Sequence, residues 1–500
     1  MKMRIKKITT SAAAILMAMT FLSATAFAAP GGTPPGDPPD GGMGGGPGGA
    51  PGSSASVSYT GASEISDSQT LADASYSSTN SAENALLVSG GEPTLTNPTV
   101  TKSGDTGDEN SDFYGTNAAI LVYNDATLNI TGGTVTTDGS HANGVFAYGT
   151  GTVNISDTTV YTSANNSGGI MVTGGGTLNA SNLTVETQGN SSAAIRSDRG
   201  GGTLTVDGGS YTTNGQGSPA IYSTADITVS NATLTSTASE GVVVEGANSV
   251  TLNNTLLTDT NNTLNGQSTT YKNIFLYQSQ SGDAAEGTSY FTATDSSIVT
   301  NQGDTFYITN TNSVITLTHN AIVNNDNNGA FLRAEAAAWG SSGSNGGQVR
   351  LALSNQTAEG DIVIDSVSTL AMTLADGSTY KGAIDNANQA KSVTLTLDES
   401  SILILTGDSY VDSLDNAVTD NSNIYLNGYK LYVNGKEISA NDGAAPDVDS
   451  PEVTAPDGSS AEIATAESSE PSPVVWIVVG LLAVAAMAGG VCFMVMKKRK

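Results

Sequence analysis

The chain has 500 residues, of which 38% are hydrophobic and 13% charged, and its formal net charge at pH 7 is −29. A surface this acidic repels nucleic acid, which excludes nucleic acid as a partner. The single cysteine, Cys492, lies close to the C-terminus, so no disulfide can stabilise the rest of the chain.

The N-terminus has the pattern of a secretory signal peptide. Four cations fall within residues 1–7, an apolar run begins at Ile8, and Ala26, Phe27 and Ala28 precede Ala29. A basic region, a short apolar core and a small-residue cleavage site are typical of export signals. We therefore predict a signal peptide over residues 1–28. The Gly/Pro-rich residues 29–56 form a leader that contains too few apolar residues to fold.

The middle of the chain repeats about every 25 residues. Similar tetrapeptides begin at Thr127, Thr152, Thr177, Thr203, Asp226 and Ser249. Each early unit holds three short apolar clusters separated by Gly, Asn, Asp and Ser, and such a unit buries its apolar face only against neighbours. This pattern predicts an all-β fold, a right-handed parallel β-helix over residues 57–438.

Three columns of apolar residues keep one register through these units. The first strand contributes Leu128, Val153, Leu178, Leu204, Ile227 and Val250, and then, two residues on, Ile130, Ile155, Ala180, Val206, Val229 and Leu252. The second strand contributes Val135, Val160, Val185, Tyr211 and Leu234, and the third contributes Ile120, Val145, Ile170, Ile195 and Ile221. Because strand side chains alternate between faces, these residues are expected to point inward. Asn129, Asn154 and Asn179 should then point outward and hydrogen-bond along the axis.

The repeat is less regular after Leu257, although short strand-like runs continue. We expect further coils with longer loops, notably over residues 332–348, where residues 334–339 could form one helical turn. Two similar segments, 423–428 and 430–435, predict a hairpin that closes the end of the solenoid.

The C-terminal region predicts a membrane anchor. Residues 439–473 are acidic and contain proline, which is typical of an extended stalk. Residues 474–496 carry no charge, and residues 497–500 are all basic. A run of this length can cross a bilayer, and the cations favour a cytoplasmic end. We therefore predict a single C-terminal transmembrane helix at the cell membrane, with the N-terminal body outside.

The stacked units resemble the pectate-lyase-like superfamily of right-handed parallel β-helices. The Gly-rich leader and the block that begins at Leu397 are similar to clostridial exported β-helix proteins, described as adhesin-like or carbohydrate-binding. The resemblance implies surface binding to polysaccharide, assisted by calcium. Polygalacturonases of this fold carry the motifs Asn-Thr-Asp, Asp-Asp, Gly-His-Gly and Arg-Ile-Lys. Because none occurs in the exported body, we assign no catalytic residue and expect no enzyme activity.

One side of the third strand provides candidate carbohydrate-binding residues. The outward positions form an apolar and aromatic stripe, and Trp339 adds a lone loop tryptophan. The candidates are Leu121, Tyr123, Phe146, Tyr148, Met171, Arg196, Tyr222 and Trp339. An exposed stripe of this kind marks an interface. The alternatives are that a loop or a neighbouring subunit covers the stripe, and that Trp339 is a local packing residue.

An acidic insertion provides candidate metal ligands. If Leu95 aligns with Leu128, the coil between them is longer than its neighbours, and the excess contains Asp105, Asp108, Glu109 and Asp112. Clustered carboxylates on a loop suit calcium. The alternative is a solvated acidic loop.

These observations predict a membrane-anchored surface adhesin or polysaccharide-binding protein, whose partner is extracellular polysaccharide or another surface protein. Two alternatives stay open. One is a structural, self-associating surface protein, and the other is a polysaccharide lyase or hydrolase whose active-site residues have not been recognised.

Overall fold

The computed structural model describes residues 57–448 and 452–461. The predicted signal peptide, leader, transmembrane segment and tail, at residues 1–28, 29–56, 474–496 and 497–500, lie outside these residues. Among the residues that are described, no helix is long and apolar enough to cross a membrane.

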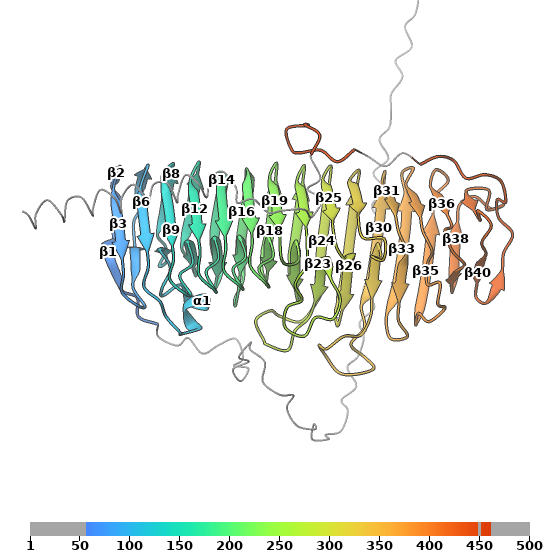
Figure 1. The fold of residues 1–500 in the computed structure, drawn as a ribbon, viewed down its shortest axis with the longest axis horizontal. Helices are drawn as coiled ribbons and strands as arrows, with labels where there is room; N and C mark the ends of the chain where they lie inside the picture. The colour runs from blue at the N-terminus through green and yellow to red at the C-terminus, as the bar shows by residue number, and fades with distance from the viewer. Residues whose placement is uncertain (1–56, 449–451, 462–500) are drawn as a thin grey trace, which may run out of the picture. The chain divides into compact units, whose positions relative to one another are not determined.

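The described residues form a parallel β-solenoid of the right-handed type with about 15 turns. Its strands stack in three columns along one axis (Figure 1), and neighbouring strands within a column pair in parallel. The predicted all-β parallel solenoid is therefore confirmed.

The first column begins each repeat tetrapeptide. It contains β2 (Thr70–Ala72), β5 (Thr94–Thr96), β8 (Thr127–Thr131), β11 (Thr152–Ser156), the first halves of β14 (Gly176–Thr187) and β16 (Gly202–Thr213), β18 (Asp226–Ser230), β21 (Ser249–Asn253), β24 (Thr288–Thr294), β27 (Asn312–Thr318), β30 (Gln348–Ser354), β33 (Thr369–Ala375), β35 (Ser392–Leu397) and β38 (Ser413–Asn416).

The second column follows after a short corner. It contains β3 (Ser75–Ser78), β6 (Thr99–Lys102), β9 (Thr134–Thr137), β12 (Thr159–Thr162), the second halves of β14 and β16, β19 (Thr233–Ser236), β22 (Leu256–Asp259), β25 (Ser297–Thr300) and β28 (Ala321–Asn324). In later coils a separate sheet takes this place, with β31 (Thr357–Glu359), β34 (Thr379–Lys381), β36 (Ile402–Ile404) and β39 (Ile424–Tyr425).

The third column is a sheet of twelve strands. It contains β1 (Gly61–Ile65), β4 (Asn84–Val88), β7 (Ile120–Val122), β10 (Val145–Tyr148), β13 (Ile170–Thr173), β15 (Ile195–Ser197), β17 (Ile221–Ser223), β20 (Val242–Glu245), β23 (Lys272–Tyr277), β26 (Asp304–Thr309), β29 (Leu332–Ala334) and β32 (Ile362–Ile364). Near the C-terminus a smaller sheet follows, with β37 (Ser409–Val411), β40 (Leu431–Val433) and β41 (Lys436–Glu437).

The predicted inward register is confirmed. Leu128 pairs with Val153, and Val153 pairs with Leu178, while Ile120 pairs with Val145 in the third column. All the inward residues named above are buried, and they share one continuous core. Burial of such side chains contributes about 1.5–3 kcal/mol each, so the stacked columns are the main source of stability.

Outward polar side chains hydrogen-bond from coil to coil. The Asn154 Nδ2 donates to the Asn129 Oδ1 at 2.9 Å, and the Asn179 Nδ2 donates to the Asn154 Oδ1 at 2.9 Å, which confirms the predicted asparagine ladder. At the next corner Asp157 and Asn182 both have left-handed backbone, with φ of +52° and +53°. Asn and Asp tolerate this conformation better than other side chains, which explains their recurrence between the first two columns.

Three local expectations are wrong. Leu95 pairs with Ile130 rather than Leu128, because the coil that contains the insertion is 35 residues long (130 − 95) and not 33. Residues 334–339 are not helical; the short helix α1 (Asn110–Tyr114) lies in the acidic insertion instead. Segments 423–428 and 430–435 do not pair with each other.

Each of those two C-terminal segments pairs in parallel with the coil before it, since Leu403 pairs with Ile424 and Ser409 with Leu431. The antiparallel hairpin joins β40 to β41 instead, where Asn434 and Gly435 have positive φ. Asn-Gly suits the tight turn of a two-residue hairpin. Residues 452–461, inside the predicted stalk, also contact the body and are described below.

Candidate binding face on the third column

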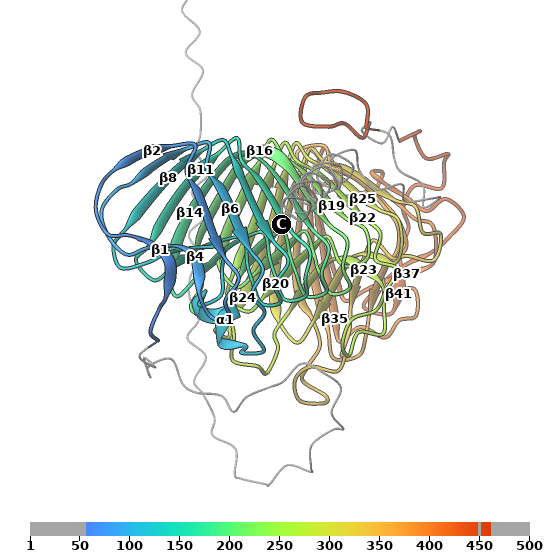
Figure 2. The same cartoon turned by 60° about the vertical axis from the view of Figure 1, so that its left-hand side comes forward.

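The outward side of the third column carries one row of large side chains. Leu121, Phe146, Met171, Arg196 and Tyr222 pair in that order on successive strands, as the sequence predicts. The row continues through Val243, Phe275, Tyr307 and Arg333. Figure 1 and Figure 2 show α1 and the long loops of the later coils projecting from the same side of the solenoid.

The predicted exposure of this row is wrong for its first members. Leu121, Phe146 and Met171 are 0% exposed and form an apolar cluster separate from the main core, together with Leu87 and Ala118. The insertion that contains α1 folds back over them. A Cβ atom on Gly115 would lie 2.8 Å from the Leu121 Cδ1 and 2.9 Å from the Phe146 Cγ. Covered in this way, the three apolar side chains do not reach a ligand in this conformation.

Four half-buried tyrosines lie beside the covered row. Tyr59, Tyr114, Tyr123 and Tyr148, here called the tyrosine patch, come from the first described residues, from α1 and from two neighbouring strands. The ring centroids of Tyr59 and Tyr123 are 4.6 Å apart, and those of Tyr114 and Tyr148 are 5.7 Å apart. Burial raises the pKa of Tyr59, Tyr123 and Tyr148, so these phenols stay neutral at physiological pH. The patch therefore offers uncharged aromatic surface.

A buried ionic cluster lies beneath α1. The His141 Nδ1 is 2.9 Å from the Asp112 Oδ2, and the His141 Nε2 is 3.1 Å from the Asn166 Nδ2. The Arg196 Nη2 donates to the Asp198 Oδ2 at 3.0 Å. The cluster thus attaches α1, through Asp112, to the outer face of the sheet.

Burial and neighbouring charges shift the pKa of two groups in this cluster. Burial raises the pKa of Asp198 to about 6, an effect that Arg196 opposes and that the nearby carboxylates of Asp283 and Asp112 reinforce. The hydrogen bond between the His141 ring and the Asp112 carboxylate, which accepts, raises the pKa of His141.

Arg199 connects α1 to the loop of residues 278–287. Its guanidinium lies 3.8 Å from the centre of the Phe113 ring, and its Nε donates to the Asp283 Oδ1 at 2.5 Å. The side chain is 43% exposed. Phe113 and Tyr114 are neighbours in α1, so this helix carries both a residue of the tyrosine patch and the ring that Arg199 contacts.

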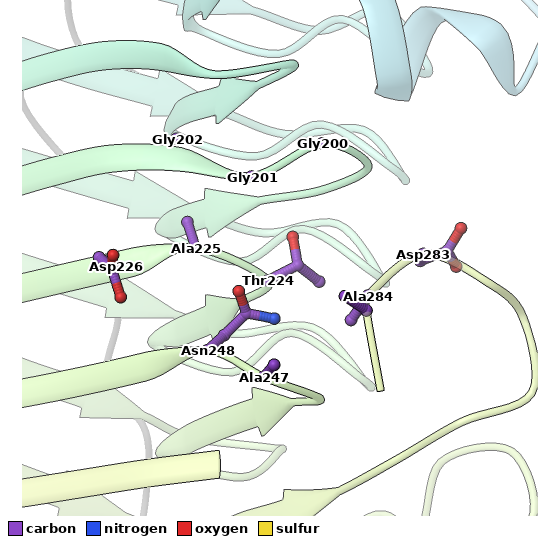
Figure 3. A pocket seen from close by; sticks show the side chains of 11 residues that line it. Gly200, Gly201, Gly202, Thr224, Ala225, Asp226, Ala247, Asn248, Asp283 and Ala284 are labelled. Atoms are coloured by element: carbon purple, nitrogen blue, oxygen red, sulfur yellow. The ribbon is translucent and has the colours of Figure 1, made fainter. Parts of the chain in front are cut away.

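Asp283 also lines a polar hollow of about 340 Å³ that is open to solvent, here called the corner pocket. It is lined by Gly200, Gly201, Gly202, Thr224, Ala225, Asp226, Ala247, Asn248, Asp283, Ala284 and Ala285. Figure 3 shows Thr224 and Asn248, from successive coils, pointing toward Ala284 of the loop. At Gly202, with φ +151°, a Cβ atom would lie 2.3 Å from the Gly176 carbonyl oxygen, so only glycine fits there. The side chains offer hydroxyl, amide and carboxylate groups, which suit sugar hydroxyls.

Trp339 and Tyr222 belong to a second packed cluster farther along the row. The Trp339 ring is 5.4 Å from Phe275 and 5.3 Å from Tyr277, which makes Trp339 a packing residue in this structure. The Tyr222 hydroxyl donates to the buried Glu245 carboxylate at 2.5 Å. Glu245 also accepts from the hydroxyls of Tyr277 and Ser279.

The four predicted metal ligands point to different partners. The Asp105 Oδ1 accepts from the Ser140 N–H at 2.7 Å, the Asp108 Oδ1 accepts from the Asn110 N–H at 3.0 Å, and Asp112 contacts His141. Glu109 precedes α1 as its N-cap residue, without a side-chain capping bond. Within residues 57–448 and 452–461, no group of three or more His, Cys, Asp or Glu side chains could hold a metal ion.

The structure brings the predicted Tyr123 and Tyr148 together but adds partners that the sequence did not indicate. Tyr59 precedes β1, Tyr114 belongs to the insertion, and Arg199 and the corner pocket lie at a corner of the solenoid beside the loop of residues 278–287, so these parts are far apart in sequence. The adjacent aromatic residues Phe113 and Tyr114, inside an otherwise acidic insertion, were the one sequence signal that this segment packs against the body.

A scan against protein-family models matched no family, and a search of curated proteins found no match. The geometry of the third column is therefore the basis for the functional proposal below.

Proposed function

We propose that the chain is a membrane-anchored cell-surface adhesin that binds extracellular polysaccharide along the outer face of the third column. The observation that carries this proposal is that α1, Arg199 and Asp283 connect the tyrosine patch to the corner pocket. The patch and the pocket together combine uncharged aromatic surface with grouped hydroxyl, amide and carboxylate groups.

The shape of the face suits an extended ligand. The coil of Tyr123 and the coil of Asn248 are five coils apart, which corresponds to about 24 Å along the axis at ~4.8 Å per coil. A chain of several sugar rings is long enough to reach from the tyrosine patch to the corner pocket, whereas a single small molecule would contact only one of them. Aromatic rings stack on the C–H faces of sugars, and the polar groups of the pocket bind hydroxyls.

The charge of the face favours a neutral polysaccharide. Asp226 and Asp283 line the corner pocket, and Arg199 already pairs with Asp283. An acidic uronate chain would be repelled unless a cation lay between the two partners. Calcium-assisted binding of uronates is the variant of the proposal that the acidic insertion suggests, and chelation of calcium separates the two variants.

The ends of the chain support a location at the cell surface. The predicted signal peptide exports the body, and the predicted span at residues 474–496 retains it at the membrane. The resemblance to exported, carbohydrate-binding β-helix proteins is consistent with this role, but the solenoid alone hosts many activities.

The test is glycan binding by the detergent-solubilised full chain and by the double variant Tyr123→Ala/Tyr148→Ala. We expect the variant to lose about tenfold in affinity, since each of the two aromatic contacts contributes about 0.5–1.5 kcal/mol. The matched control is Tyr290→Ala, because Tyr290 is 48% exposed on a first-column strand. Binding that survives in the double variant overturns the proposal.

Two further measurements separate the alternatives. Assays for reducing ends and for unsaturated products detect a hydrolase or a lyase. Concentration-dependent sedimentation without glycan binding indicates a self-associating structural protein.

A further inference from the structure

The outward face of the second column changes its chemistry partway along the solenoid. One outward row reads Thr159, Thr184, Ser210 and Thr233 on successive strands, and then Leu256, Ser297 and Ala321. In the next row, Thr258 is followed by Val299 and Val323. Outward apolar side chains thus gather on β22, β25 and β28, where earlier coils carry hydroxyls.

These outward apolar residues are nevertheless buried. Leu256 is 8% exposed and Val299 is 1% exposed, and they form a cluster apart from the main core. The cover is the segment of residues 452–461, whose Val453 is itself 8% exposed and packs in the same cluster. Ala455 and Ala461 lie at the edge of this contact.

Two hydrogen bonds fix the segment on the solenoid. The Thr454 N–H donates to the Ser297 Oγ at 3.0 Å, and the Asn254 Nδ2 donates to the Pro456 carbonyl oxygen at 3.2 Å. The partners are 157 and 202 residues apart in the chain. The segment thus makes its apolar contacts and its hydrogen bonds at the strands whose outward residues are apolar. This coincidence indicates a specific contact.

The segment is folded for this contact by bonds of its own. Thr454 and Ser460 form an antiparallel bridge, and the Ala455 N–H donates to the Ser459 carbonyl oxygen at 2.8 Å. Gly458, with φ +79°, closes the turn between them. A preorganised turn loses less conformational entropy on docking than a flexible segment does.

We infer that residues 452–461 are a clasp that fastens the C-terminal part of the chain to the flank of the solenoid, over Leu256, Val299 and Ala321. The clasp thus returns the chain to the middle of the solenoid, away from the last coils. The occupant of the apolar patch is therefore this chain's own segment.

The clasp sets the orientation of the solenoid at the membrane, a consequence that rests on the predicted span and hence on the proposed function. A tether fixed at mid-length holds the solenoid side-on. The clasp itself does not depend on glycan binding.

Cross-linking tests the clasp in the full chain. The pair Ser297→Cys and Thr454→Cys is introduced together with Cys492→Ser, so that no native thiol competes. A mild oxidant should join this pair as a disulfide about tenfold more efficiently than the control pair Ser210→Cys and Thr454→Cys, because a held pair has a high effective concentration. Ser210 occupies the same outward row three coils away.

Equal linking of the two pairs, or no link at Ser297, overturns the clasp. Adding Val453→Asp to the Ser297 pair should abolish the link, because a carboxylate cannot be buried against Leu256 and Val299 without a partner. A link that persists in this variant also overturns the proposed packing.

Energy transfer tests the orientation separately. Dyes on Thr101→Cys and Asp420→Cys, each in a Cys492→Ser chain in proteoliposomes with acceptor lipids, should report similar heights above the bilayer. Thr101 lies in the second coil and Asp420 in the fourteenth, so an end-on solenoid would separate the two heights by about 58 Å at ~4.8 Å per coil. Unequal heights with an intact cross-link overturn the side-on orientation alone, and neither result depends on whether glycan binds.

Discussion

Two outward faces of this solenoid follow the same strand alternation but differ in their exposure to solvent. On the first column, the outward residues Asn129, Asn154 and Asn179 are short, polar and hydrogen-bonded from coil to coil. On the third column, the outward residues Leu121, Phe146 and Met171 are large and apolar, and a folded insertion covers them. Alternation along a strand therefore determines which way a side chain points, whereas the loops determine whether that side chain meets solvent.

The largest expected loss of stability follows the removal of a side chain from the covered row, compared with the removal of an aromatic side chain that no loop covers. Phe146→Ala should cost about 3–5 kcal/mol of unfolding free energy, because it opens a cavity between the sheet and α1. Tyr161→Ala, at a half-buried outward position of the second column, should cost clearly less. Chemical denaturation measures both. Equal, small losses would mean that the insertion does not cover Phe146 in solution.

The next expected effect is a dependence of folding stability on pH, caused by Asp198. Because burial raises the pKa of Asp198 from its usual value near 3.8 to about 6, the folded state binds this proton more tightly than the unfolded state. The resulting stability is fully present below about pH 4 and is lost as pH rises through about 6, by up to about 3 kcal/mol.

The variant Asp198→Asn removes this titration. Its unfolding midpoint, relative to the wild type, should therefore rise between pH 4 and pH 7. His141, whose pKa is also raised, loses its contribution in the same direction as it deprotonates, and it does so in both proteins. A difference between wild type and variant that does not change with pH would contradict the burial of the Asp198 carboxylate beside Arg196.

A smaller loss of stability tests directly whether the insertion covers Leu121 and Phe146. Gly115→Ala should cost about 1–3 kcal/mol, because Gly115 has φ +72° and an added methyl group would lie against Leu121 and Phe146. Hydrogen exchange over residues 104–118 should accelerate. Gly107→Ala is the control, since a Cβ atom there meets nothing within 4 Å. If the two variants exchange alike, α1 does not pack as described.

The smallest effect falls on the exposed ladder. Asn154→Ala removes one bond to Asn129 and one from Asn179, but water can reach the groups left behind, so the cost should be about 1 kcal/mol. Thr205→Ala, at an exposed position in the same row, should be near neutral. A loss for Asn154→Ala as large as that for Phe146→Ala would remove the contrast between the two faces.

Much of the core could be predicted from the sequence, because its signal is local and repeated. Leu128, Val153 and Leu178 recur at the same place in successive units, and strand alternation then places them inward. Strand alternation likewise predicts that Asn154 points outward. The repeat spacing misplaced Leu95 by one inward position because the insertion changes the number of residues in that coil.

The covering contacts could not be predicted in this way. The insertion that buries Phe146 is irregular, so no period indicates where α1 lies. The Arg199–Asp283 ion pair joins residues 84 positions apart across two loops, and the clasp joins Thr454 to Ser297 across 157 positions. Such contacts depend on how loops fold over a finished sheet, which residue spacing does not encode.

The most direct test of the binding face is hydroxyl-radical footprinting of the full chain with and without a bound polysaccharide. We predict that Tyr114, Tyr123 and Tyr148 become protected on binding, while Tyr290 and Tyr429, which are 48% and 42% exposed, keep their reactivity. Protection of Tyr290 or Tyr429, with the tyrosine patch unchanged, would contradict the assignment of the third column as the binding face.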